Sequence, residues 1–85
     1  MQSTNQVETA NSLPTLRIGS QGEYVSYLQS ILNYYGYAIA VDGIFGKKTE
    51  DAVKKFQKSR NLKVDGIVGP KTWNALLADY QEPPC

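Results

Sequence analysis

Asp42 and Asp65 are the residues whose type and spacing could do chemistry, because each begins a copy of one short motif. The motif is Asp-Gly-x-x-Gly-x-Lys-Thr, and its two copies lie 23 residues apart in register. Two carboxylates can share the acid and base steps of glycoside hydrolysis. An aspartate can also hydrogen-bond the backbone two residues ahead, with the following glycine supplying a positive φ. Equivalent positions in a repeat favour the second role, so we predict that both aspartates build turns.

Other site chemistries are excluded by residues that the sequence lacks. The chain has no histidine and a single cysteine, Cys85, so a zinc site is not expected. Gly46 and the Lys-Lys-Thr that follows it lack the glycine spacing of a phosphate-binding loop. Each motif copy brings one carboxylate, which is too few for a calcium loop. We therefore predict no catalytic residue, no metal site and no cofactor, and a protein that is not an enzyme.

The basic residues gather in the second half of the chain. The formal net charge of +1 predicts no partner by itself. Between positions 47 and 63, however, two acidic residues stand against seven basic ones, namely Lys47, Lys48, Lys54, Lys55, Lys58, Arg60 and Lys63. This local excess could attract an anionic polymer, or it could simply keep the surface solvated. Lys47 and Lys48 are the predicted contacts for acidic groups.

Six tyrosines in 85 residues are more than so small a core can bury. Exposed aromatic side chains often mark a binding surface, although each tyrosine could equally be structural. Three apolar residues on the first expected helix follow one another at about one-turn spacing, beside a stripe that faces the core. We predict a shallow groove where the C-terminal end of this helix meets the first motif loop. The predicted ligand-binding residues are Tyr27, Ile31, Tyr34, Asp42, Phe45, Lys47 and Lys48.

The elements that must position these residues are three helices. A chain of 85 residues, of which 41% are hydrophobic, has room for one domain. Apolar residues at helical spacing predict helices over residues 21–35, 47–59 and 70–78. The predicted fold class is therefore all-α, a small three-helix bundle with two related Asp-Gly-x-x-Gly loop-helix repeats.

Local signals set the ends of these elements. Ser20, with Glu23 three residues later, has the pattern of a capping box and is the expected N-cap of the first helix. Gly36 is the expected left-handed residue that ends this helix. In each loop the first apolar residue between the two glycines, Ile44 or Ile67, is expected to tuck under the turn.

The ends of the chain differ in composition from its middle. Residues 1–12 are polar and predict a disordered lead or linker, residues 13–80 form the domain, and residues 81–85 predict a linker remnant. No apolar run of signal-peptide length begins the chain, so an export signal would have to lie outside it.

The motifs taken together resemble the peptidoglycan-binding domain found beside many bacterial cell-wall hydrolases. The resemblance extends from about Leu16 to Leu77. It rests on Leu16-Arg17-Ile18-Gly19, Gly22, Leu28-Gln29, Gly36-Tyr37, Asp42-Gly43-Ile44-Phe45-Gly46, Phe56-Gln57, Asp65-Gly66-Ile67-Val68-Gly69-Pro70 and Thr72-Trp73. Lys47 departs from the family pattern, which usually has proline after the first loop, yet lysine also suits a first helical turn.

The resemblance implies a non-catalytic binding module that anchors a larger protein to bacterial peptidoglycan. The implied partners are the glycan strand, the stem peptide or both, and an adjacent hydrolase domain, with no nucleic acid and no membrane. It implies a monomer in the cell envelope, either periplasmic or extracellular. Some members of the family are spacers or docking modules, and a similar fold forms the pro-segment of some metalloproteases. The alternative is therefore a protein-interaction or inhibitory prodomain-like module that packs on an adjacent catalytic domain.

Overall fold

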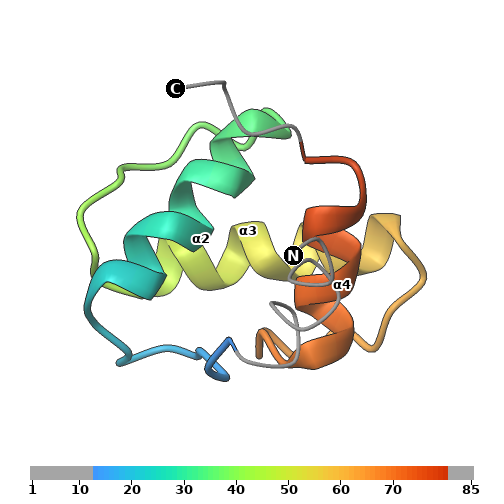
Figure 1. The fold of residues 1–85 in the computed structure, drawn as a ribbon, viewed down its shortest axis with the longest axis horizontal. Coiled ribbons are helices and arrows are strands. Elements are labelled where there is room, and N and C mark those ends of the chain that lie inside the picture. Colours follow the sequence, from blue (N-terminus) through green and yellow to red (C-terminus); the bar gives the residue numbers. More distant parts are fainter. Residues whose placement is uncertain (1–12, 81–85) are drawn as a thin grey trace, which may run out of the picture.

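The computed structural model describes residues 13–80 and has three helices within that range (Figure 1). They are α2 (Glu23–Tyr34), α3 (Lys47–Ser59) and α4 (Pro70–Ala78), and the described residues form no sheet. The predicted all-helical class and the three predicted helices are confirmed. The predicted lead at residues 1–12 and the predicted linker at residues 81–85, with Cys85, lie outside the described residues. No described helix is long and apolar enough to span a membrane.

The start of α2 differs from the prediction. Its N-cap is Gly22, with φ 122° and ψ −170°, and no side chain caps the helix. Ser20 instead closes a turn before the helix, where its Oγ accepts a hydrogen bond of 3.1 Å from the Arg17 backbone N–H. The prediction that Ser20 is the N-cap is therefore wrong. The backbone at position 22 has a positive φ, which favours glycine, so the chain enters the helix two residues later.

The C-terminal ends of α2 and α3 share one geometry. After α2, Gly36 has φ 96°, and its N–H donates to the Asn33 carbonyl while the Tyr37 N–H donates to the Leu32 carbonyl. This pair of bonds satisfies carbonyls that the helix leaves free, and it confirms Gly36 as the stop. After α3, Asn61 has φ 59° and takes the same place. Asparagine is the other residue that often adopts this left-handed conformation.

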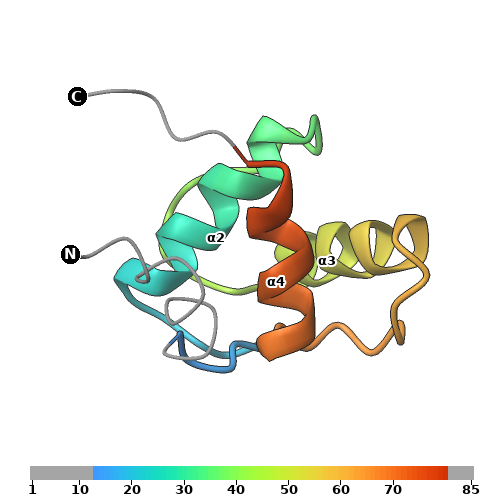
Figure 2. The same cartoon turned by 45° about the vertical axis from the view of Figure 1, so that its right-hand side comes forward.

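One hydrophobic core lies between the three helices. Its fully buried large side chains come from every element, and they include Leu28, Phe45, Phe56, Trp73 and Leu76. Helix α2 packs against both α3 and α4, and Figures 1 and 2 show α3 running across the molecule behind the other two. The Trp73 indole N–H donates to the Pro14 carbonyl at 2.8 Å, which fixes the start of the described chain to α4.

The segment of residues 16–22, which includes a turn from Arg17 to Ser20, joins the two motif loops, which we call the first loop (residues 42–46) and the second loop (residues 65–69). Leu16 exchanges two backbone hydrogen bonds with Val68 of the second loop, at 3.0 and 2.8 Å. Further along, Gly19 and Ser20 bond to Phe45 of the first loop. The segment therefore positions both loops relative to one another before α2 begins.

Candidate functional site

A buried glutamine of α2 holds the first loop. The Gln29 Nε2 group donates to Asp42 Oδ1, the Ile44 carbonyl and Thr49 Oγ1, each at 3.0 Å. Its Oε1 atom accepts from the backbone N–H groups of Asp42 and Gly43, at 3.0 and 2.9 Å. Because Gln29 is 1% exposed, these bonds form away from competing water. One side chain thereby fixes the loop and the first turn of α3.

Gln57 of α3 repeats this arrangement in the second loop. Its Nε2 donates to Asp65 Oδ1, the Ile67 carbonyl and Thr72 Oγ1. Its Oε1 accepts from the N–H groups of Asp65 and Gly66. Each glutamine thus binds the loop that follows its own helix. The sequence signal is a Gln that precedes each Asp-Gly pair, although the spacing differs between the copies.

One carboxylate oxygen of each aspartate takes part in its turn. Asp42 Oδ1 accepts from the Ile44 N–H at 3.0 Å, and Asp65 Oδ1 accepts from the Ile67 N–H at 2.9 Å. These backbone bonds, the largest cause for both groups, lower the pKa of each carboxyl below its ordinary value. A general acid would need a raised pKa, so the turn-building prediction fits both residues. Among residues 13–80, no group of three or more His, Cys, Asp or Glu side chains could hold a metal ion.

Two of the predicted ligand-binding residues lie in the core. Ile31 is 0% exposed and Phe45 is 1% exposed, so neither side chain can face a ligand at the surface. Phe45 also takes the place that we expected for Ile44, which is 52% exposed. In the second loop Val68 is fully buried while Ile67 is only half-buried. The second residue between the glycines therefore points inward, and the prediction for Ile44 and Ile67 is wrong.

The other five predicted residues divide into two groups, because Tyr27 and Tyr34 both pack against Tyr80, away from Asp42, Lys47 and Lys48. Asp42 lies beside Gln29 and the N-terminal half of α2, and the Gly22 N–H donates to the Gly43 carbonyl there. Tyr34 lies at the opposite end of α2, beside the end of α4 (Figure 1). The first loop thus meets the N-terminal half of α2, and the predicted groove at its C-terminal end is not formed.

Lys47 and Lys48 are exposed at the start of α3. The Lys47 ammonium group lies 3.4 Å from Glu50 and 3.7 Å from Asp51, in ion pairs on the surface. Surface pairs of this kind contribute little to stability. Both lysines remain accessible to solvent, although they lie far from Tyr34.

A tyrosine cluster occupies the surface where α2 and α4 end, and it consists of Tyr27, Tyr34, Tyr35 and Tyr80. The Tyr34 ring packs edge-on against the rings of Tyr80 and Tyr35, with centroids 5.0 and 5.2 Å apart. Tyr27 meets Tyr80 edge-on and stacks on the buried Trp73. Sequence reasoning found Tyr27 and Tyr34 but missed the contribution of Tyr80, because only tertiary packing brings α4 beside α2.

Tyr35 fixes this cluster to the helices below it. Its hydroxyl donates to the Leu76 carbonyl at 2.6 Å, and the Arg60 guanidinium lies over its ring, 5.3 Å from the centroid. Arg60 also pairs with Asp79 at 3.0 Å. Burial raises the pKa of the Tyr35 phenol above its ordinary value. The exposed Tyr34 ring is thereby held on a rigid support.

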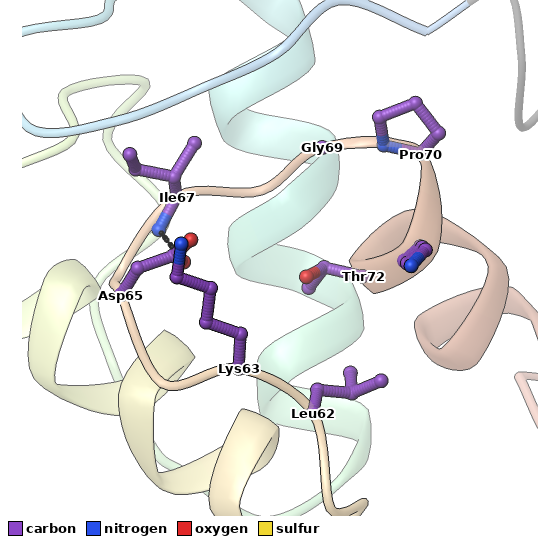
Figure 3. A pocket seen from close by; sticks show the side chains of 8 residues that line it. Leu62, Lys63, Asp65, Ile67, Gly69, Pro70 and Thr72 are labelled. Carbon is purple, nitrogen blue, oxygen red and sulfur yellow. Dashed lines mark hydrogen bonds between the residues drawn. The ribbon is translucent and has the colours of Figure 1, made fainter.

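A shallow depression of about 400 Å³ lies beside the second loop (Figure 3). Its lining includes the apolar side chains of Leu62, Ile67 and Pro70, with Lys63 and Lys71 contributing positive charge. The start of α4 forms one wall. The sequence analysis did not single out this depression, whose lining residues come from the segment after α3, the second loop and the start of α4.

Several known proteins contain a segment that is similar to this chain. The model of a family described as "Putative peptidoglycan binding domain" matches residues 21–76. The chain is 45% identical over 65 residues to the zinc D-Ala-D-Ala carboxypeptidase of Streptomyces albus G. It is 44% identical over 69 residues to the spore cortex-lytic enzyme of Bacillus cereus. These matches cover 73% and 80% of the chain but only 26% and 27% of the two relatives, so the chain spans about a quarter of their length.

Solved structures show the same fold. The SleB N-terminal domain is 43% identical and has a TM-score of 0.76, with 79% of this chain and 93% of that domain covered. The Burkholderia AP3 phage endolysin is 47% identical with the same TM-score, and the match covers 82% of this chain and 27% of the endolysin. The family match spans more than half of the chain and agrees with the fold, and the chain therefore belongs to the peptidoglycan-binding domain family.

Proposed function

We propose that the chain is a non-catalytic module that holds a larger protein on bacterial peptidoglycan in the cell envelope. The observation that carries this proposal is the extent of the match. The chain aligns with about a quarter of two wall-acting enzymes and with nearly all of one separate N-terminal domain. A segment of this kind fits an attachment domain whose catalytic partner lies elsewhere in the protein.

The geometry of the loops supports a role without catalysis. A carboxyl group that acts as a general acid needs a raised pKa. Asp42 and Asp65 instead have lowered pKa values and accept hydrogen bonds from buried glutamines. Their arrangement fits a rigid scaffold for a binding surface.

The tyrosine cluster is the surface that we assign to the glycan strand. Flat aromatic rings can stack on sugar rings and lose little conformational freedom on binding. Tyr34 is 49% exposed, and its ring is already ordered by Tyr35 and Tyr80. Of the residues predicted from sequence, Tyr34 and Tyr27 belong to this surface. A part for Asp42, Lys47 and Lys48 in binding stays a separate prediction, because these residues lie on another face.

Two tyrosines of α2 provide a matched test of this assignment. Tyr24 and Tyr34 are 51% and 49% exposed, but only Tyr34 belongs to the tyrosine cluster. We expect Tyr34→Ala to weaken retention on purified sacculi by about three- to tenfold, since stacking on an aromatic ring is worth roughly 1 kcal/mol. Tyr24→Ala should leave retention unchanged. Equal losses in both variants would remove the cluster from the binding surface.

A protein-docking or inhibitory module is the second candidate function. Family members vary in this respect, and the exposed apolar side chains of Ile18, Val41 and Ile44 suit contact with a neighbouring domain. Such a module would bind its catalytic partner and ignore peptidoglycan.

Co-sedimentation with insoluble sacculi separates the two functions. We expect the 85-residue chain to pellet with sacculi and to release no soluble wall fragments into the supernatant. Dose-dependent release of fragments would show catalysis. A chain that stays in the supernatant would favour the docking function instead.

A further inference from the structure

The depression beside the second loop is a second place where the molecule could meet a ligand. We propose that it binds the peptidoglycan stem peptide, by the free carboxylates of that peptide. This inference rests on the proposed function, and it assigns a different chemistry to a different face from the tyrosine cluster. Its grounds are the charge, the apolar lining and the accessibility of the depression.

The charge of the lining suits an acidic peptide. Lys63 and Lys71 line the depression together with one acidic residue, Asp65. The Asp65 carboxylate already accepts hydrogen bonds from the Ile67 N–H and from Gln57. Figure 3 shows the Lys63 side chain extending toward Asp65. Two lysines and one carboxylate give the lining a formal excess of one positive charge, which attracts carboxylates.

The apolar part of the lining suits small side chains. Leu62, Ile67 and Pro70 contribute hydrocarbon surface between the two lysines. Alanine methyl groups alternate with carboxylates in stem peptides, so both features of such a peptide find a counterpart here. The volume of about 400 Å³ is at the lower end of the range for small-ligand sites, which fits a short peptide.

The segment of residues 16–22 makes fewer backbone hydrogen bonds with the second loop than with the first. Residues 19–22 bond to the backbone of Phe45 and Gly43 in the first loop. In the second loop the pairing involves Leu16 and Val68 alone. Where the second loop leads into α4, Pro70 and Lys71 are exposed and therefore accessible to a ligand.

The test is an NMR titration of the full chain with N-acetyl-L-alanyl-γ-D-glutamyl-L-lysyl-D-alanine, a stem peptide with two free carboxylates. We expect saturable shifts at the amides of residues 62–72. Lys71→Gln should weaken binding about two- to fivefold, as expected for one partly exposed ion pair. The affinity should also fall as salt is raised. Lys55→Gln, which removes an exposed lysine from α3, is the matched control and should bind like the wild type.

A second pair of variants separates binding from folding. Pro70→Glu places a carboxylate in the depression at the first position of α4, where an acidic residue stabilises a helix. We expect this variant to stay folded and to lose at least tenfold in affinity for the peptide. Pro70→Gln introduces a side chain of the same length as glutamate but without charge, and it should lose much less affinity for the peptide.

Three outcomes would overturn the inference. The first is the absence of chemical-shift changes at the amides of residues 62–72. The second is a probe with amidated carboxylates that binds as tightly as the unmodified peptide. The third is inorganic phosphate that shifts the same amides and displaces the peptide at equal concentration, which would show a general anion site. If wild-type chain pellets with sacculi in any of these cases, the proposed function stands and only the inference fails. A chain that does not pellet removes the proposed function itself.

Discussion

The first and second loops receive the same set of hydrogen bonds from a buried glutamine, yet their surroundings differ. Gln29 and Gln57 each bind an aspartate, a loop carbonyl, a threonine hydroxyl and two backbone N–H groups. The first loop is also paired with residues 19–22, whereas the second loop pairs only with Leu16. The depression lies beside the second loop.

This difference shows that one local motif can serve two tertiary roles. The interior of each loop depends on its own sequence and on one glutamine. The neighbouring segment, residues 16–22, makes more backbone hydrogen bonds with the first loop than with the second. The first loop is therefore tied more closely to the start of α2, and we propose that the second loop forms a binding surface.

The largest expected effect comes from removing the glutamines. We expect Gln29→Ala and Gln57→Ala each to lower the free energy of unfolding by about 2–4 kcal/mol, since each leaves buried polar groups without partners. Urea denaturation measures this loss. The exposed Gln21→Ala should change stability by less than about 0.5 kcal/mol. If the free energies of unfolding of Gln29→Ala and Gln57→Ala differed by more than about 2 kcal/mol, the hydrogen bonds within the two loops would not be equivalent.

A somewhat smaller effect is expected from the glycines that follow the aspartates. Gly43 and Gly66 have φ values of 75° and 74°, which a β-branched residue resists. Added side chains would also meet Ser26 at position 43, and Glu50 and Lys54 at position 66. We expect Gly43→Val and Gly66→Val each to cost about 2–3 kcal/mol.

Thermal melting of these variants beside Lys48→Ala provides the comparison. Lys48 is exposed on the first turn of α3, so its replacement should cost less than about 0.5 kcal/mol. Equal melting temperatures for Gly43→Val and Lys48→Ala would refute the turn geometry. A large loss at position 43 with none at position 66 would show that only the first loop needs its turn.

The smallest expected effect is the response to acid. Backbone N–H donors lower the pKa of Asp42 and of Asp65 below the ordinary value of 3.8. Folding therefore favours the ionised carboxyls, and this stabilisation is complete above about pH 4 and is lost as the pH falls through the lowered pKa values. In Asp42→Asn and in Asp65→Asn, the free energy of unfolding should decrease less steeply as the pH falls below 4. If only one variant did so, the two turns would differ in their electrostatics.

The sequence predicted the helices because local physics sets them. Apolar residues at helical spacing fixed the three spans, and the left-handed glycine at position 36 fixed one end. The turn role of the aspartates followed from their positions in the repeat. Each of these features depends on neighbours within a few residues along the chain.

Features that depend on distant contacts could not be predicted. Ile44 and Phe45 are adjacent and both apolar, and only the bonds of the loop to Gln29 and to residues 19–22 turn Phe45 inward. Ile31 belongs to a stripe that looked outward on an isolated helix, but α2 packs against two other helices and buries it. The tyrosine cluster needs Tyr80, which folding brings beside Tyr34.

A binding isotherm on purified sacculi is the measurement that tests the central claim most directly. The account predicts saturable retention of the 85-residue chain with an apparent Kd in about the micromolar-to-millimolar range. Retention should fall when an amidase has stripped the stem peptides, and some should persist on the remaining glycan. Equal, non-saturating retention on sacculi and on cellulose, or no retention on sacculi at all, would contradict the claim that this chain holds its parent protein on peptidoglycan.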